Sequence, residues 1–227
     1  GTQTDAADFN VGIGYKALED LTIGQRNTAL GYQAGYDLTG ATYNTMIGMG
    51  AMGSVTADVV GVTAIGYNSV PASGLTTGAN YTVGIGYSAL AALTSGQKNV
   101  AIGYQSGLET LIGDSNISIG YQAFVGDAGL QNDNNIAIGS ANPDGTLGAL
   151  GGQWTGVAST NNIAIGTGSM AGAMNAANHN TAIGHTALAA VTLGDGNTAV
   201  GSLAGDSVTD GDYNTLIGYQ SGTEGQN

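Results

Sequence analysis

The sequence contains no cysteine and only 2 prolines in 227 residues. The lack of cysteine excludes disulfide bonds, thiolate metal sites and cysteine nucleophiles. No apolar run approaches the ~18 residues of a membrane-spanning helix, so we expect no membrane insertion. The chain begins with Gly1 rather than Met, so we expect a processed chain or a fragment, and a targeting segment could precede it.

Basic residues are almost as scarce. Lys and Arg total 3 against 16 Asp and Glu, which gives a formal net charge of −13. Such a chain repels phosphate groups, so we expect no binding to nucleic acid and no attraction to anionic membranes. All charged residues together make up 8% of the chain, against about a quarter in an average protein. Solubility therefore depends on Asn, Gln, Ser, Thr and backbone groups.

What the sequence does contain is a five-residue unit that recurs twelve times. Residues 27–31 read Asn-Thr-Ala-Leu-Gly and residues 180–184 read Asn-Thr-Ala-Ile-Gly. Most intervals between successive units are 17 to 20 residues, and one is 27. This period is too short for helical repeats and suits a coil of two short strands and two turns. Each unit ends in a closing glycine, and these are Gly14, Gly31, Gly48, Gly66, Gly86, Gly103, Gly120, Gly139, Gly166, Gly184, Gly201 and Gly218.

The repeat predicts an all-β fold, a parallel β-solenoid (β-roll) of about twelve 17-residue coils. We expect an N-terminal lead-in at 1–9, a single repeat domain at 10–222 and a C-terminal tail at 223–227. Within the repeat domain, insertions are expected at 70–80 and 141–160, where the interval lengthens.

Each position of the unit forms a column of similar residues. The first is Asn in ten coils, the third is small except at Met46 and Leu216, and the fourth is always branched and aliphatic. Tyr follows the closing glycine in seven coils, and Ala or Ser lies three residues after it in all coils but one, where Asn142 stands.

Because side chains alternate along a strand, the first, third and fifth positions share a small face, and the second, fourth and Tyr positions share a bulky one. Which face lines the interior stays open at this point. Stacking in register predicts an amide ladder and an aliphatic ladder. The ladder residues are Asn27, Asn44, Asn99, Asn116, Asn135, Asn162, Asn180, Asn197, Asn214, Ile47, Ile102, Ile119, Ile138, Ile165 and Ile183.

The unit Asn-x-Ala-Ile-Gly followed by small residues, clearest at 134–139 and 161–166, resembles the head repeats of trimeric autotransporter adhesins. It is also similar to repeats in the shafts of bacteriophage tail fibres. The resemblance covers about residues 10–222 and implies a homotrimer of left-handed parallel β-rolls, outside the cell or on a virion, used for attachment. Coils of the adhesin heads are shorter than those here, and the longer stretch at 32–40 resembles the phage repeats more.

Self-association is also expected from the residues. A thin coil cannot bury both a small and a bulky face, and an exposed aliphatic stripe favours burial against identical neighbours. We therefore expect the chain's main partner to be itself, in a closed cyclic oligomer, which the resemblance implies is a homotrimer.

Insertions in repeat arrays form loops on one face, which is often the binding face. The longer insertion leaves the coil at Asn142 and holds the only tryptophan, Trp154. Asn142, Gln153 and Trp154 are therefore candidate contacts to a host cell-surface glycan or protein. The alternative is that Trp154 covers a coil edge or a subunit seam.

No catalytic, cofactor or metal site is predicted. Gly48, Gly50 and Gly53 match a dinucleotide fingerprint by letter, but no helix is expected after them, so we assign these glycines to the repeat. His179 and His185 lack a third ligand for zinc.

Acidic turns, such as those at 195–197 and 210–214, make bound Ca²⁺ a weaker expectation, since turn propensity alone explains Asp, Asn and Gly there. The acids scatter over different turns. They form no carboxylate pair, so we expect no enzyme.

The Tyr column has two interpretations. Exposed aromatic rings can stack on sugars, and stacked tyrosines are also a structural device between coils. The second interpretation is the preferred one.

The sequence thus predicts a non-enzymatic fibre or adhesin segment of a surface or virion appendage, located outside the cell. The main alternative is a subunit of a self-polymerising extracellular filament, since the repeat begins by Asn10 and neither end is obviously capped. An ice-binding solenoid is less favoured, because Val and Ile interrupt the Thr column. A glycan-degrading solenoid is less favoured because basic subsite residues are scarce.

Overall fold

The computed structural model describes residues 7–71, 75–76, 78–110, 112–125, 129–152, 154 and 156–222. The chain divides into two compact units, Gly1–Ile112 and Gly113–Asn227. Across the described ranges the regular structure is all β, without a helix. The predicted parallel β-solenoid is confirmed, with about twelve turns counted over both units.

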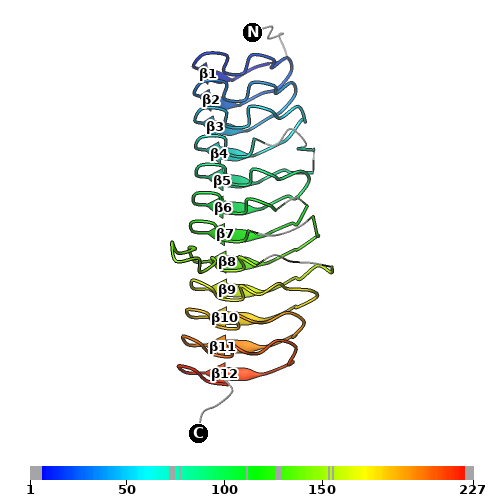
Figure 1. Ribbon diagram of the computed structural model, residues 1–227. Helices are drawn as coiled ribbons and strands as arrows, with labels where there is room; N and C mark the ends of the chain where they lie inside the picture. Colours follow the sequence, from blue (N-terminus) through cyan, green and yellow to red (C-terminus); the bar gives the residue numbers. More distant parts are fainter. Residues whose placement is uncertain are drawn as a thin grey trace. The chain divides into compact units, whose positions relative to one another are not determined.

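Each coil contributes one strand of three residues, and the strands of a unit stack in chain order (Figure 1). The first unit contains β1 (Val11–Ile13), β2 (Thr28–Leu30), β3 (Thr45–Ile47), β4 (Thr63–Ile65), β5 (Val83–Ile85) and β6 (Val100–Ile102). The second contains β7 (Ile117–Ile119), β8 (Ile136–Ile138), β9 (Ile163–Ile165), β10 (Thr181–Ile183), β11 (Thr198–Val200) and β12 (Thr215–Ile217).

Neighbouring strands within a unit are parallel and pair without any shift of register. In the first unit Thr28 pairs with Thr45 and Leu30 with Ile47. In the second, Thr181 pairs with Thr198 and Ile183 with Val200. Every position of the repeat therefore lies over its equivalent in the next coil, which confirms the columns read from the sequence.

The expectation of two strands per coil is wrong. Outside β1–β12 the described residues add only an isolated bridge between Thr42 and Val60. The rest of the coil cannot stay extended, because residues at fixed positions adopt left-handed backbone conformations. Among the residues that the structure describes, twenty-eight other than glycine have φ between 45° and 64°, where such residues are normally uncommon.

Most of these residues fall in three columns, which turn the chain in every coil. One column precedes the first-position Asn, as at Arg26, and the others lie two and four residues after the closing glycine, as at Gln33 and Met52. A turn repeated at the same place in each coil keeps the coils congruent, which in-register pairing requires.

The closing glycine is required for two reasons. Its φ lies between 123° and 158° in all twelve coils, a region that only glycine occupies without strain. A Cβ added at Gly31 would also lie 2.5 Å from the carbonyl oxygen of Gly48 in the next coil. A side chain at this position would therefore force neighbouring coils apart.

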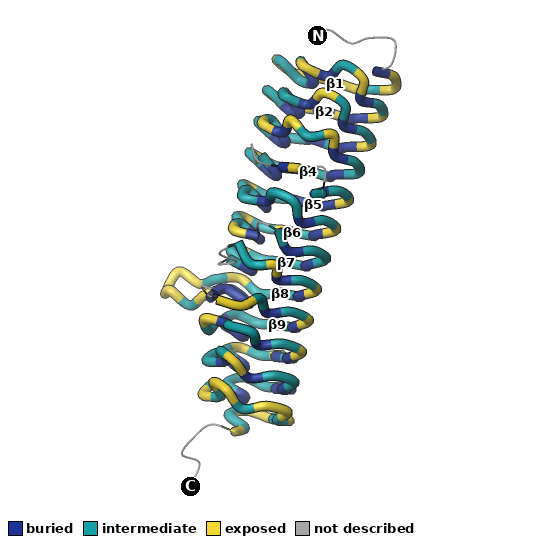
Figure 2. The backbone as a smooth tube through the Cα atoms, turned by 90° about the vertical axis from the view of Figure 1, so that its right-hand side faces the viewer, coloured by how far each residue is buried: buried dark blue, intermediate teal, exposed yellow. Residues whose placement is uncertain are grey.

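The small face lines the interior of the coil, which answers the question the sequence left open. The central strand residues Ala29, Ala64, Ala137 and Ala182 are fully buried, whereas the residues on either side of them in the strand are partly or fully exposed (Figure 2). Larger side chains from the turns complete the core. In the first unit these include Leu21, Leu38 and Leu93, and in the second Phe124, Met170 and Met174.

The two departures from the small third column are compensated by nearby glycines. A Cβ at Gly35 would lie 2.9 Å from the sulfur of Met46, and a Cβ at Gly205 or Gly222 would lie 2.7 Å from a methyl carbon of Leu216. Met46 and Leu216 thus fill space that a side chain occupies in other coils, which keeps the packing density constant.

The column of Ala and Ser is not broken at Asn142, contrary to the sequence interpretation. Ala149 is buried and its N–H donates to the carbonyl of Gly139 at 3.3 Å, as that of Ala123 does to Gly120 in the preceding coil. The chain leaves the coil after Ala141 and returns at Leu147, so Ala149 occupies this column.

These observations predict the cost of a side chain in the closing-glycine column. A Cβ at Gly166 would lie 2.5 Å from the carbonyl oxygen of Gly184, at a φ of 129°. Gly166→Ala is therefore expected to lower the free energy of unfolding by about 3 kcal/mol, measured by urea denaturation.

Gly145→Ala is the matched control. Gly145 also has a positive φ, of 94°, but nothing lies within 4 Å of its added Cβ. We expect it to cost about 1 kcal/mol, from backbone strain alone. Equal losses in the two variants would contradict the close-approach argument.

Candidate functional site

The predicted amide ladder runs through the interior of the first unit. The Oδ1 of Asn10 accepts from the backbone N–H of Asn27 at 2.9 Å and from its Nδ2 at 3.1 Å. The Oδ1 of Asn27 accepts from Asn44 in the same way, at 3.0 and 3.1 Å. The Nδ2 of Asn27 also donates to the carbonyl of Ala41 at 2.7 Å. Each amide thereby serves both its own coil and its neighbour.

The same ladder runs through the second unit. Backbone N–H groups of Asn135, Asn162, Asn180, Asn197 and Asn214 each donate to the Oδ1 of the Asn one coil before, at 2.9–3.0 Å. In the first unit Asn99 lies in the same column and is equally buried. Because the position is buried, the hydrogen bonds of the ladder also satisfy the amide itself, which would be costly to leave unpaired in the core.

Two coils carry other residues in this column. Val62 and Thr82 are buried where the repeat has Asn. The N–H of Val62 still donates to the Oδ1 of Asn44 at 2.8 Å, so the ladder ends with its last acceptor satisfied.

The ladder predicts that the loss of one Asn side chain lowers the free energy of unfolding substantially. In Asn180→Ala, the backbone N–H of Asn197 loses its acceptor and the carbonyl of Gly194 loses its donor, both inside the coil. We expect the free energy of unfolding to fall by about 3 kcal/mol, measured by urea denaturation. Asn142→Ala removes the same side chain from an exposed loop and is expected to change stability by under about 0.5 kcal/mol. Similar losses in both variants would argue against the ladder.

The predicted aliphatic ladder lies on the outside of the coil. Ile47, Ile119, Ile138 and Ile165 are half-buried, and Ile102 and Ile183 are exposed. Together with the second-position residues they form what we call the outer face. The fold leaves this apolar face of each unit uncovered.

Stacked tyrosines border the outer face, as the structural interpretation of that column predicts. In the first unit Tyr15 and Tyr32 stack with ring centroids 5.3 Å apart, and Tyr87 stacks on Tyr67 at 4.9 Å and on Tyr104 at 5.1 Å. The rings remain 42–62% exposed, so one face of the column stays accessible.

A cavity of about 420 Å³ lies beside the long insertion of the second unit. It is lined by Tyr121, Gln122, Ala141, Asn142, Pro143 and Gly145. The exposed loop 142–146 projects beside β8 (Figures 1 and 2) and forms one wall. The candidate contact Asn142 is therefore brought together with an aromatic ring and an amide that the sequence interpretation did not include.

Trp154 is not among the residues that line this cavity. Its indole is fully buried and packs against Phe124, with ring centroids 5.2 Å apart and planes tilted by 57°. The proposal that Trp154 contacts a receptor is therefore not supported by its position. The apolar ring belongs to the hydrophobic core of the second unit, whereas polar residues of the insertion form the projecting loop. Gln153, the third candidate, lies outside the described residues.

Hydrogen bonds at the turn hold the loop in shape. The N–H of Asn142 donates to the carbonyl of Thr146 at 2.8 Å, and the N–H of Thr146 donates to a carboxylate oxygen of Asp144 at 2.9 Å. The bond from Thr146 lowers the pKa of the Asp144 carboxyl, because it stabilises the charged form.

This shift predicts how the loop responds to acid. The stabilisation by Asp144 is complete above the ordinary pKa of an aspartate and is lost as pH falls through the lowered one. The Thr146 amide proton is expected to shift at a pH below the ordinary aspartate pKa, measured by NMR, and Asp144→Asn is expected to abolish that titration. A midpoint at or above the ordinary value would contradict the prediction.

The acidic turns have a structural role that the sequence interpretation missed. Two residues before the first-position Asn, a side-chain oxygen accepts a backbone N–H from the coil before. Asp212 accepts from Asp195 at 2.8 Å, Asp195 from Asn178 at 2.6 Å, and Asp133 from Asp114 at 2.8 Å. The sequence signal for this role is the Asp or Asn that recurs two residues before the first-position Asn. Over the described ranges, no three His, Asp or Glu side chains cluster as a metal site would need; Ca²⁺ binding stays an untested expectation.

The part of the chain that the structure describes has no helix long and apolar enough to cross a membrane. Comparison of the chain with protein-family models, with curated proteins and with solved structures gave no match.

Proposed function

We propose that this chain is a non-enzymatic segment of a fibre or adhesin on a cell-surface or virion appendage, where it assembles as a homotrimer and takes part in attachment. The observation that carries the proposal is the outer face. Ile or its equivalent recurs in every coil of each unit and points away from the core, flanked by partly exposed Thr, Val or Ile.

The outer face supports self-association because it repeats with the coil. A single copy leaves a row of aliphatic side chains uncovered, one from each strand of a unit, and soluble proteins rarely expose large contiguous apolar patches. An identical chain presents the same row at the same spacing, so each Ile could be buried against its counterpart in a closed cyclic assembly. A trimer is the assembly that the resemblance to adhesin heads and phage fibres implies.

Rigidity supports the fibre role. Within each unit, backbone pairing and the fixed left-handed turns recur from coil to coil, and the amide ladder adds side-chain bonds between successive coils that carry Asn. Such a unit transmits force without a flexible linker.

Attachment is assigned to the loop cavity beside Asn142. Tyr121 offers an aromatic surface there, and Gln122 and Asn142 offer amide groups, a combination suited to a host cell-surface glycan or protein. An extracellular or virion-surface location belongs to this proposal.

The first test is the mass of the chain in solution. We expect a particle of three times the 22.3 kDa of one chain. Replacing Ile47, Ile65 and Ile85 together by Thr keeps β-branched residues in the strands. It removes about 1.5–3 kcal/mol of apolar burial per site in the assembly, so the variant is expected to be a folded monomer by light scattering and circular dichroism.

Ile23→Thr is the control, since Ile23 is exposed in a turn outside the outer face; it should leave the assembly intact. A wild-type monomer at high concentration would refute the trimer.

A further inference from the structure

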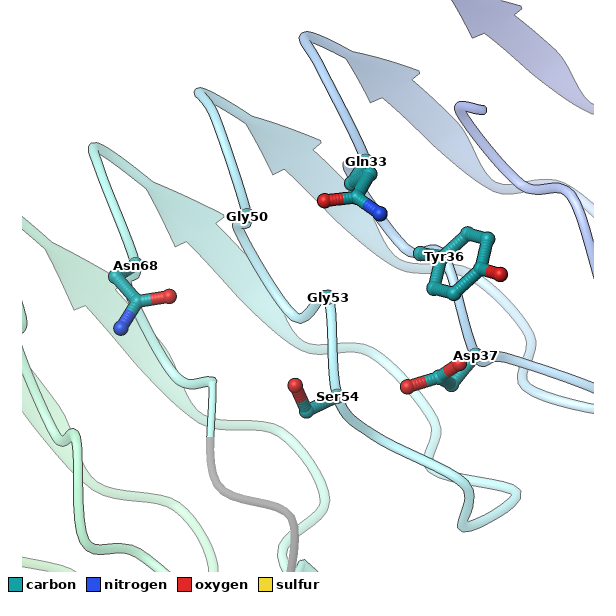
Figure 3. A pocket seen from close by; sticks show the side chains of 7 residues that line it. All are labelled: Gln33, Tyr36, Asp37, Gly50, Gly53, Ser54 and Asn68. Carbon is teal, nitrogen blue, oxygen red and sulfur yellow. The ribbon is translucent and has the colours of Figure 1, made fainter. Parts of the chain in front are cut away.

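A second cavity, in the first unit, comes from two glycines that do not follow the repeat. It has a volume of about 290 Å³ and is lined by Gln33, Tyr36, Asp37, Gly50, Gly53, Ser54 and Asn68. Figure 3 shows the side chains of Gln33 and Asn68 on either side of Gly50, with Tyr36, Asp37 and Ser54 alongside Gly53.

Gly50 and Gly53 belong to the Gly-x-Gly-x-x-Gly stretch that the sequence interpretation assigned to the repeat. Only Gly48 is a closing glycine. Two residues after it, the same column carries Lys16, Gln33, Asn68, Ser88 and Gln105 in the other coils of this unit. Gly50 thus omits a side chain that its neighbours have, and Gly53 omits one where the preceding coil has Tyr36. The two omissions leave a notch one coil wide.

The dimensions of the notch follow from the stacking. Gln33 and Asn68 lie two coil steps apart, and with coils about 4.8 Å apart the gap between their backbones is about 10 Å. The volume falls near the lower end of the roughly 300–1,000 Å³ of small-molecule sites. This space suits one six-membered sugar ring.

The side chains that line the notch offer both hydrogen-bond donors and hydrogen-bond acceptors. Gln33 and Asn68 each carry both a hydrogen-bond donor and an acceptor, Ser54 a hydroxyl, and Asp37 a carboxylate that only accepts when ionised. Tyr36 adds an aromatic ring. Donors and acceptors beside a ring match the hydroxyl groups and C–H faces of a sugar.

Lys16 contacts the Tyr36 side chain and fixes its position. The Nζ of Lys16 lies 5.0 Å from the centre of the Tyr36 ring and 3.5 Å from its hydroxyl oxygen. Lys16 also pairs with Glu19 at 3.6 Å. The ring is therefore positioned before any ligand arrives, which reduces the entropy lost on binding.

Other ligand classes fit less well. The Asp37 carboxylate and the overall charge of −13 oppose phosphate, sulfate and carboxylate ligands. A dinucleotide would need a helix N-terminus at its pyrophosphate, and the described residues form no helix. Ca²⁺ takes 6–8 oxygen ligands, whereas the lining holds one carboxylate.

We propose that this notch is a binding site for one neutral hexose unit of a glycan, with Gly50 and Gly53 as its floor and Gln33, Tyr36, Asp37 and Asn68 as its walls. The inference rests on the attachment role proposed above and deepens it, because it names a ligand class and a second contact point in the other unit.

The test is an NMR titration of the full chain with glucose, galactose, mannose and N-acetylglucosamine in turn, and with inorganic phosphate as the anionic comparison. At least one hexose is expected to shift the backbone amide signals of Gly50, Gly53 and Asn68 saturably, with a Kd of roughly 1 mM. Phosphate is expected to leave them unchanged. No saturable shift with any of the four hexoses, or a shift with phosphate only, would overturn the proposal.

Gly50→Gln fills the notch with a side chain that the same column already holds at Gln33 and Gln105. An added Cβ would lie 3.1 Å from the Asn68 side-chain oxygen, which can turn away. We expect hexose affinity to fall by about tenfold or more. Ser88→Gln places the same side chain in the same column two coils further on, at a φ of 51°, and is expected to bind as the wild type does. Unchanged affinity in Gly50→Gln would refute the site.

Asp37→Asn is a second variant that is expected to fold. Burial, together with the nearby Asp20, raises the pKa of the Asp37 carboxyl, so its charge does not stabilise the native state and its removal should not weaken the fold. Weaker hexose binding in this variant supports the site, and unchanged binding contradicts the role of the carboxylate.

The mass of the same sample separates the two proposals. A trimer that binds no hexose loses only the sugar site, and a monomer that binds hexose at the notch loses only the proposed assembly.

Discussion

The structure of each unit depends on coils lying in register at the spacing of a parallel sheet. At that distance the backbone of one closing glycine lies against that of the next, as between Gly31 and Gly48. No side chain fits between them. The same distance lets an Asn amide accept a backbone N–H from the following coil, and lets tyrosine rings stack. A change of register would disrupt all of these contacts together, because each joins equivalent residues.

The columns have different tolerances, and the differences follow from what each column touches. The closing glycine has a positive φ in every coil, which disfavours a Cβ, and at positions such as Gly31 and Gly166 the next coil also leaves no space for one. The Asn column tolerates Val62, since the N–H of Val62 still donates to the Oδ1 of Asn44. It also tolerates Thr82, whose hydroxyl donates to the carbonyl of Asn80 at 3.5 Å. The third column tolerates Met46 where Gly35 leaves room. Half-buried positions, such as the column of Gln33 and Ser88, vary most. The two proposed attachment sites, the loop at Asn142 and the notch at Gly50, lie where the repeat varies.

Self-association is proposed for the regular outer face, and attachment for the two cavities. The outer face presents regular aliphatic rows, which suit an identical partner. The two cavities interrupt the regular pattern, one by added residues and the other by missing side chains. A regular surface cannot distinguish one position along itself from another, so recognition of a small ligand requires such interruptions.

The sequence by itself determined the solenoid, the number of coils, the columns and the amide ladder, because a strict repeat leaves one register in which equivalent residues meet. It did not determine that each coil holds one strand, since left-handed turns at residues such as Arg26 and Met52 carry no glycine to reveal them. Only the tertiary structure decided which face is inside, that Trp154 is buried, that Ala149 resumes its column, and that Gly50 and Gly53 open a notch. The reason in each case is packing across the coil. This packing brings together residues whose separation along the chain does not follow the two-residue alternation of a strand.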